Sequence, residues 1–305
     1  MTTTAPITPG HFPTSPLALR TTDPDRQAPI RAFASEQAAA ASTAATRIVD
    51  LWTQAGTHAD RITALGQVHA ELIEWRHRLA LAAAGRLGQG LTHDPERFRT
   101  PITGHSANFD RIGQVGRLRE GSVWDAATRT YTGGASTPAW EAMDRYGRAA
   151  LARFTIEAPD DDELQNWITL PNGIRLAGNR LLRGAAARAA AEQLTVRVAA
   201  RGLDASRMET GGQPLYTVTP DSEHSALLHQ WALILLTTPA PTLQDYLTAR
   251  YLMFQAPQTK KGSDSVTRVF VVAAGAVLFG DRAPALPADI DLRCYVLGQA
   301  AACRP

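Results

Sequence analysis

Apolar side chains recur at helical spacing along most of this chain. Between residues 59 and 87 they stand three or four positions apart, at Ile62, Leu65, Val68, Leu72, Trp75 and Leu79. This period places them on one face of an α-helix. The same pattern predicts helices over residues 35–56, 138–154, 173–202 (with a break point at Gly184), 221–238 and 243–256, and after Gly262 and Pro287.

Polar residues mark the starts of several of these helices. Thr137 precedes Pro138, and a threonine cap followed by proline at the first helical position is a typical start. Thr242 is followed three residues later by Asp245, close to a capping box. Thr219 is expected to cap the helix over 221–238. These capping residues define more closely where the predicted helices begin.

One region breaks that pattern. Within the glycine-rich residues 88–136, the piece "GRLREGSVWDAATRTYTGG" predicts a β-hairpin near residues 117–131, and "GGQPLYTV" predicts a short strand. The Pro- and Thr-rich residues 1–34 are expected to form a flexible N-terminal arm. The predicted fold is therefore mainly α, a multi-helix bundle with a small β-hairpin flap, in which residues 35–305 form a single helical domain.

Composition narrows the class of protein. Hydrophobic residues make up 44% and charged residues 20% of the 305, which is enough for a buried core, and the net charge of +2 does not indicate a nucleic-acid partner. The two cysteines, Cys294 and Cys303, do not predict a disulfide framework or a cysteine metal site. No signal peptide and no apolar run of about 18–20 residues stands out, so a cytoplasmic protein without a membrane partner is expected. The excess of arginine and alanine is typical of a GC-rich genome, such as that of an actinobacterium.

A polar loop between two apolar helices carries the most informative residues. It holds the only two lysines of a chain with 29 arginines, Lys260 and Lys261. The next helix begins directly after them, and a helix N-terminus binds anions readily through free N–H groups and its dipole. The loop therefore predicts a phosphate site, whose ligand-binding candidates are Lys260, Lys261, Gly262, Ser263, Asp264, Ser265 and Arg268. The alternative is a solvated turn in which Ser263 or Asp264 simply caps the helix.

Two segments resemble the Fic (filamentation induced by cAMP) family. In that family an apolar helix leads into the loop His-Pro-Phe-x-Asp/Glu-Gly-Asn-Gly-Arg-x-x-Arg, which opens a buried helix. In "FQAPQTKKGSDSVTR", Pro257, Gly262 and Arg268 stand at the family's proline, first glycine and final arginine. "GRLREGSVWDAATRTYTGGASTPAWEAM" is similar to the flap hairpin that holds a target segment beside the active loop. The two segments cover a small part of the chain, and neither motif is intact.

The positions at which this chain differs from the family motif include those that carry out the family's reaction. Ala256 stands in place of the histidine that accepts the target's proton, and Lys261 in place of the carboxylate that binds Mg²⁺. The loop is one residue longer, and Ser263, Asp264 and Ser265 replace Asn, Gly and Arg. The resemblance implies transfer of a nucleotide-derived or phosphate-containing group to a hydroxyl or amine. The missing histidine equally implies an inactive Fic-like protein that binds and does not catalyse, and no cofactor is indicated.

His224 is the candidate for a replacement base, because it lies near the start of the helix over 221–238 and could reach a neighbouring loop. The simpler interpretation is a histidine on a helix surface. His69 and His77 share a helix with glutamates, but they are eight residues apart, which is not the spacing of a helical zinc pair. The acidic run Asp160–Glu163 predicts a short helix whose N-terminus it stabilises.

An arginine-rich segment supports a third function. Residues 173–207 hold seven arginines against Glu192 and Asp204, and arginines three to five apart can follow a nucleic-acid backbone. Aromatic residues and a helix-turn-helix are lacking, so nucleic acid is the less favoured partner. The expected partners are a nucleotide or phosphorylated small molecule at the loop and a protein target at the hairpin.

Overall fold

Helices make up most of the structure, a computed structural model that describes residues 6–83, 94–103 and 107–304. The α-helices are α1 (Pro24–Gln54), α2 (His58–Ala82), α3 (Pro138–Glu157), α4 (Gly184–Ala199), α5 (Ser222–Leu236), α6 (Leu243–Gln255), α7 (Ser263–Phe279), α8 (Ile290–Val296) and α9 (Gln299–Ala302). The strands are β1 (Phe109–Ile112), β2 (Val123–Asp125), β3 (Thr130–Thr132), β4 (Glu163–Thr169), β5 (Arg175–Leu182) and β6 (Leu215–Val218). The prediction of a mainly α fold with a small β-hairpin, β2–β3, is confirmed.

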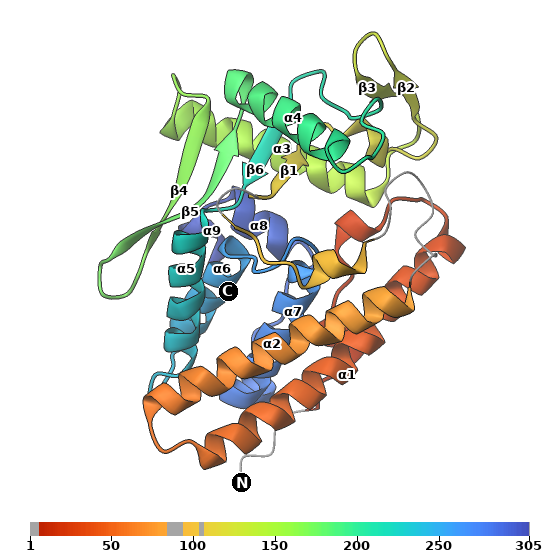
Figure 1. Cartoon of the computed structure of the whole chain (residues 1–305). Helices are drawn as coiled ribbons and strands as arrows, with labels where there is room; N and C mark the ends of the chain where they lie inside the picture. The colour runs from red at the N-terminus through yellow and green to blue at the C-terminus, as the bar shows by residue number, and fades with distance from the viewer. Residues whose placement is uncertain (1–5, 84–93, 104–106, 305) are drawn as a thin grey trace.

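The lower part of the molecule in Figure 1 is a helical bundle around α7. Helix α7 packs against α1, α2 and α6, and every residue from Ser265 to Ala276 is buried. Its core also includes side chains of α5 and Phe12 of the N-terminal segment. Among the described helices, the stretch Ser263–Arg282 is long and apolar enough to cross a membrane by length and composition, with a mean hydropathy of 1.4, but 61% of it is buried within the protein. A helix that is buried in the core of a protein and does not cross a membrane can meet the same criterion.

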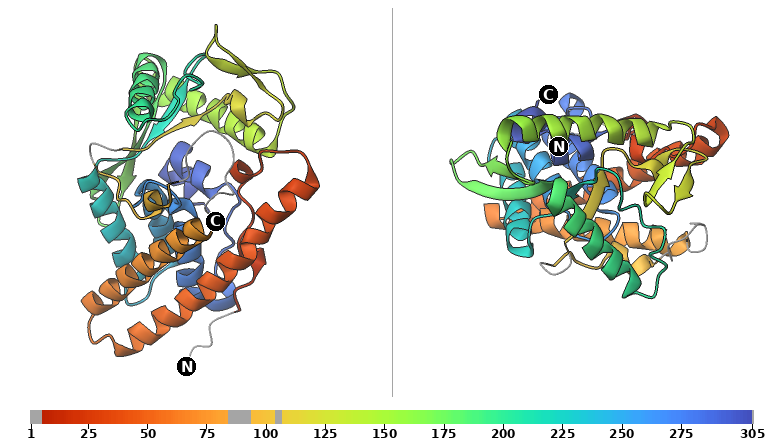
Figure 2. Two further views of the ribbon diagram at one scale, coloured as in Figure 1. Left: turned by 45° about the vertical axis from the view of Figure 1, so that its right-hand side comes forward. Right: turned by 90° about the horizontal axis from the view of Figure 1, so that it is seen from above.

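The upper part is a four-stranded antiparallel sheet in the order β1-β6-β5-β4. Successive side chains of a strand point to opposite faces, so each face packs its own layer. Helix α4 covers one face, over Leu182, Tyr216 and Val218. Helices α3 and α8 cover the other, and the view from above places the sheet between α3 and α4 (Figure 2).

Two of the predicted helices are wrong. The acidic segment after Ala158 leads into β4, and the first part of the predicted helix 173–202 is β5, which pairs with β4. Alternate residues of β4 are buried, among them the polar Asn166, which conceals the two-residue period from a hydrophobicity pattern. The break point at Gly184 is where α4 begins. Asp162 accepts a hydrogen bond from the Ala185 backbone N–H at 2.6 Å, so the acidic run does stabilise a helix start, that of α4.

The other boundaries follow the capping signals closely. Thr137 caps α3, and Thr242 forms a capping box with Asp245 at α6. Asp221, not Thr219, caps α5. Helix α1 begins at Pro24, so residues 24–34 of the predicted arm are helical, while residues 1–5 and the predicted end of the second helix at residue 87 lie outside the described part.

Candidate functional site

The loop between α6 and α7 is paired along its backbone with η3 (Pro95–Phe98) and the residues that follow it. The N–H of Lys260 donates to the Thr100 carbonyl, and the N–H of Lys261 donates to the Arg97 carbonyl, both at 3.0 Å. Pro101 and Thr259 form an antiparallel bridge between the same segments. The amide groups of the two lysines therefore have protein acceptors, and any contact with a ligand would fall to their side chains.

The backbone conformation at position 262 and the side chains around it both require glycine there. Its φ of 78° lies in the left-handed region, and an added Cβ would lie 2.6 Å from Phe98 Cδ1 and 2.9 Å from Arg76 Cγ. The Arg76 guanidinium lies 4.4 Å above the Phe98 ring and donates from Nε to Ser265 Oγ at 3.0 Å. The loop is thus fixed from outside by two residues that belong to distant parts of the sequence.

The two loop serines hold the turn together. Ser263 Oγ donates to the Thr259 carbonyl at 2.9 Å, and Ser265 Oγ donates to the Gly262 carbonyl at 2.9 Å. The predicted cap at Ser263 or Asp264 is wrong, because the N-cap is Gly262 and no side chain caps the helix. The first N–H groups of any α-helix have no acceptor within the helix itself. The start of α7 therefore keeps the backbone donors that the sequence assigned to an anion.

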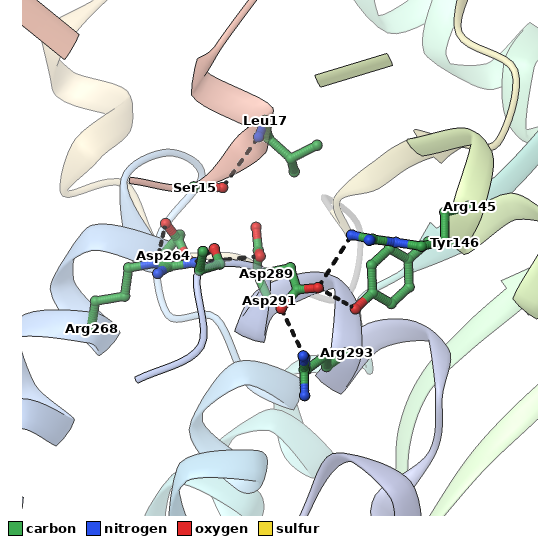
Figure 3. A network of polar contacts seen from close by, with 10 residues as sticks. Ser15, Leu17, Arg145, Tyr146, Asp264, Arg268, Asp289, Asp291 and Arg293 are labelled. Carbon is green, nitrogen blue, oxygen red and sulfur yellow. Dashed lines mark hydrogen bonds and ion pairs between the residues drawn. The ribbon is translucent and has the colours of Figure 1, made fainter. Parts of the chain in front are cut away.

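Arg268 is enclosed by carboxylates. Its Nε donates to Asp264 at 2.9 and 3.0 Å, and its Nη2 lies 3.4 Å from Asp291 Oδ1 and 2.9 Å from the Ala288 carbonyl oxygen (Figure 3). The side chains of Arg268 and Asp291 are 4% and 7% exposed, whereas that of Asp264 is 40% exposed. Burial and the charge of Asp264 raise the pKa of Asp291 to about 7, against the opposing effect of Arg268. These contacts hold the start of α7 against the segment that leads into α8, and they do not extend to Lys260 or Lys261.

Five cationic side chains gather on the other side of the loop, and we call them the cationic cluster: Arg97, Arg197, Arg201, Lys260 and Lys261. Burial and the charges of Arg197, Arg97 and Arg201 lower the pKa of Lys260. Burial and Arg97 lower the pKa of Lys261, and burial and Arg201 lower the pKa of Arg97. Charges from η3, the loop and the C-terminal end of α4 thus act together on Lys260, Lys261 and Arg97.

The positive charge of this cluster is poorly compensated. Within the described residues, no ion pair involves Arg97, Arg197, Arg201 or Lys261, and Asp94 is the carboxylate whose charge acts on Arg97 and Lys261. Arg197 is held by the Ala107 carbonyl at 2.8 Å and by the Phe109 ring at 4.9 Å. Arg201 donates from Nε to the Arg197 carbonyl at 3.2 Å. These contacts position the guanidinium groups and leave their charge available to an anion.

In the described ranges, no hydrogen bond or ion pair joins the remaining arginines of the predicted nucleic-acid segment to this cluster. Arg175 lies over the Trp167 ring, and Arg180 pairs with Glu163 at 2.7 Å. Arg183 donates to carbonyl groups of the turn before β4. The seven arginines therefore do not form one stripe, because β5 and α4 divide them between different surfaces.

His224 has its own local partner. Its Nδ1 lies 2.8 Å from the carboxylate of Asp221, the N-cap of α5, and within the described residues no hydrogen bond or ion pair joins it to the loop 256–268. His69 and His229 lie together with ring centroids 4.7 Å apart. Burial lowers the pKa of His229 to about 4 and, together with the charge of His229, that of His69 well below its ordinary value. No group of three His, Cys, Asp or Glu side chains in the described ranges could hold a metal ion.

The hairpin β2–β3 is anchored away from the loop. The segment before β6 contacts the turn between the two strands, where the Gly211 N–H donates to the Arg129 carbonyl at 3.0 Å, and the chain before the hairpin, where the Gly116 N–H donates to Glu209 at 2.7 Å. Glu120 accepts hydrogen bonds from Thr21 and Thr22. In the part of the chain that the structure describes, no hydrogen bond or ion pair links the hairpin to residues 256–268. The segment of η3, which sequence reasoning missed, is what lies against the loop.

A scan against protein-family models and a search of curated proteins found no match to this chain. Inference about function therefore rests on the residues and on their geometry. Arg97, Phe98 and Arg76 could not be found from the sequence, since they lie in a short 3₁₀ turn and on a helix more than 150 positions before the loop that they contact.

Proposed function

We propose that this chain is a divergent Fic-like protein that binds a nucleotide or another phosphate-containing ligand at the loop 256–268. The observation that carries the proposal is the cationic cluster, in which cations from three separate segments lower the pKa of Lys260, Lys261 and Arg97. Like charges that repel one another destabilise the free protein, and a bound anion would relieve the repulsion. The start of α7 adds backbone N–H groups and a positive dipole end on the same loop.

The cluster supports binding more directly than it supports catalysis. Ala256 offers no group that accepts a proton, and His224 is engaged with Asp221. Arg268 is neutralised by two carboxylates, so the phosphate contacts are assigned to Lys260, Lys261 and Arg97. Transfer of a phosphate-containing group to a hydroxyl or amine remains the second step of this proposal, and a binding protein without catalysis is its alternative.

The test is a thermal-shift screen with ATP, GTP, CTP, UTP and sugar nucleotides, each with and without Mg²⁺. A ligand at 100 times its Kd stabilises the native state by about 2.7 kcal/mol, which for a chain of this size raises Tm by roughly 5 °C. The variant Lys260→Ala/Lys261→Ala is expected to lose the shift. Arg26→Ala/Arg148→Ala removes two charges that are paired with Glu120 and Asp144, and it should keep the shift.

Two results would decide between binding and transfer. Radiolabel moved from the stabilising nucleotide onto a protein or small-molecule hydroxyl or amine would establish the enzyme. A shift without any transfer would establish the binding protein. If none of the nucleotides shifts Tm, the phosphate site at this loop is wrong.

A further inference from the structure

Two histidines meet inside the helical bundle. His69 lies on α2 and His229 on α5, and their ring centroids are 4.7 Å apart. His69 is 5% exposed, and His229 is half-buried. Met253 of α6 and Thr267 of α7 line the same small space, so four helices of the bundle in Figure 1 converge on it. Facing helices of a bundle can hold a ligand between their side chains.

Both imidazoles lack a polar partner. His229 Nδ1 is buried and makes no hydrogen bond, and in the described ranges no hydrogen bond or ion pair involves the side chain of His69. Buried polar groups are nearly always hydrogen-bonded to the protein or to water. The space between these side chains is too small for a free water molecule. Packing of the His69 ring edge-on to Phe270, at 5.4 Å, does not account for the unpartnered nitrogen of His229.

The distance between the rings suits two ligands of one metal ion. An imidazole nitrogen lies about 1.1 Å from its ring centroid and about 2.0–2.1 Å from a bound metal, so each centroid lies about 3.2 Å from the metal. A centroid distance of 4.7 Å then corresponds to an angle of about 95° between the two metal–nitrogen bonds. An angle so far from linear leaves room for a third ligand at the same ion.

We propose that His69 and His229 bind a copper(I) ion, with the thioether of Met253 as the third ligand. A thioether is a soft ligand that selects Cu(I), and imidazole suits copper as well. Structural zinc sites take four ligands from Cys, His, Asp and Glu. Among the described residues no three of those side chains come together, which argues against zinc. The site does not depend on a phosphate ligand, so it goes beyond the proposed function.

The surroundings of the two rings favour this ion. Metal binds the neutral form of imidazole, and burial lowers the pKa of both histidines, so both are neutral near neutral pH. His229 is partly exposed, which gives the ion a way in. Ala256, Thr259 and Ser263 line the same space, so a bound ion would connect α2 and α5 directly beneath the loop 256–268.

The experiment titrates the metal-free full chain with Cu(I) under anaerobic conditions, in competition with the chromophoric chelator bicinchoninate. We expect one Cu(I) ion per chain. His229→Gln should weaken the affinity by at least about 100-fold, because even the loss of a group that only orients a metal ligand costs about 10–100-fold. Met253→Leu should weaken it by about tenfold, since leucine keeps most of the volume of methionine and removes the sulfur.

The matched control is His11→Ala/His224→Ala. It removes two imidazoles that lie outside the cavity, and it should bind Cu(I) as the natural protein does. Melts without metal show whether each variant is folded, and Cu(I) should raise the Tm of the natural protein and of this control but not that of His229→Gln. X-ray absorption of the loaded natural protein should show two imidazoles and one sulfur as ligands, whether or not a variant folds.

Four results would overturn the inference. Failure of the chain to take Cu(I) from the chelator would mean that the two rings are only packed together. Binding that His229→Gln does not alter would place the ion elsewhere, for example at Cys294 and Cys303. Unchanged affinity in Met253→Leu would remove the sulfur ligand, and retention of Zn²⁺ in preference to Cu(I) would contradict the assigned metal. Because the nucleotide screen contains no copper, its outcome is independent of all four.

Discussion

Cationic side chains lie on both sides of the loop 256–268, and the two sides differ in whether carboxylates compensate the positive charge. On one side Arg268 is buried and held by two carboxylates and a carbonyl. On the other side the cationic cluster contains Arg97 and Lys261, for which no ion pair is present in the described ranges. A charge enclosed by opposite charges is compensated by the protein itself, so it holds the structure together. A charge surrounded by like charges has no such structural use.

The rest of the surface supports this distinction. Exposed arginines such as Arg26, Arg148 and Arg180 are paired with carboxylates, in a chain whose 31 basic and 29 acidic residues are nearly balanced. Among the described residues, Arg97 and Lys261 of the cationic cluster have no such partner, and the proposed function assigns their charge to an anion. The predictions that follow test the two sides of the loop against each other.

The largest expected effect is on the enclosed side. At a pH above the pKa of Asp291, Arg268→Ala leaves this buried carboxylate without its cation, and breaking a buried ion pair in this way costs about 3–5 kcal/mol. Urea unfolding measures this loss of the free energy of unfolding. Adding Asp291→Asn to Arg268→Ala should restore part of it, because the uncompensated charge is then gone. A loss below about 1 kcal/mol in Arg268→Ala would mean that the network is not structural.

The next effect is a dependence on pH. The pKa of Asp291 is raised to about 7 by burial and by Asp264, whereas a free aspartate has a pKa of about 3.9. Between these values the folded state binds the extra proton, so the stability that Asp291 contributes falls as the pH rises. Asparagine does not titrate. The stability of Asp291→Asn relative to the natural protein should therefore increase from about pH 4 to about pH 7, by at most about 1.4 kcal/mol per pH unit.

Urea unfolding of both proteins across this range provides the measurement. The buried His69 and His229 titrate in the opposite sense, because their lowered pKa values make stability fall as the pH drops below about 6.5. That contribution is common to both proteins and cancels in the difference. Parallel stability curves for the two proteins would show that Asp291 does not hold a proton near neutral pH.

These contrasts also explain what the sequence could predict. The loop, its glycine and its cations could be found from local composition, and the capped starts of α3 and α6 from their threonines. The strand β6 was predicted from "GGQPLYTV", but β4 and β5 were missed, because the two-residue period of β4 includes the buried, polar Asn166, which hydrogen-bonds to Asn179 of β5 at 2.6 Å. Arg97 could not be assigned either, since its position beside the loop depends on backbone pairing between segments far apart in sequence. Long-range pairing of this kind leaves no local pattern.

A smaller effect is expected on the uncompensated side. Lys260→Gln/Lys261→Gln removes two of the five like charges, so the free protein should become more stable, by a few tenths to about 1 kcal/mol at low salt. Salt screens exposed charges over about 10 Å at 0.1 M, so the gain should shrink as salt increases. Arg26→Gln/Arg148→Gln, which breaks two surface pairs, should have the opposite sign. A loss of stability in the lysine variant would mean that the lysines stabilise the fold, which would contradict the proposed difference between the two sides of the loop.

The smallest effect concerns His224, which lies on neither side of the loop. His224→Ala removes one exposed contact with Asp221, but Asp221 still accepts a hydrogen bond from the backbone N–H of residue 224 and so still caps α5. The expected loss is only about 0.3–0.5 kcal/mol, and the Tm shift caused by a nucleotide should not change. If label transfer occurs and this variant abolishes it while the shift persists, His224 would be the base after all. That result would require α5 to approach the loop in the bound state, because in this structure the nearest partner of the imidazole is its own helix cap.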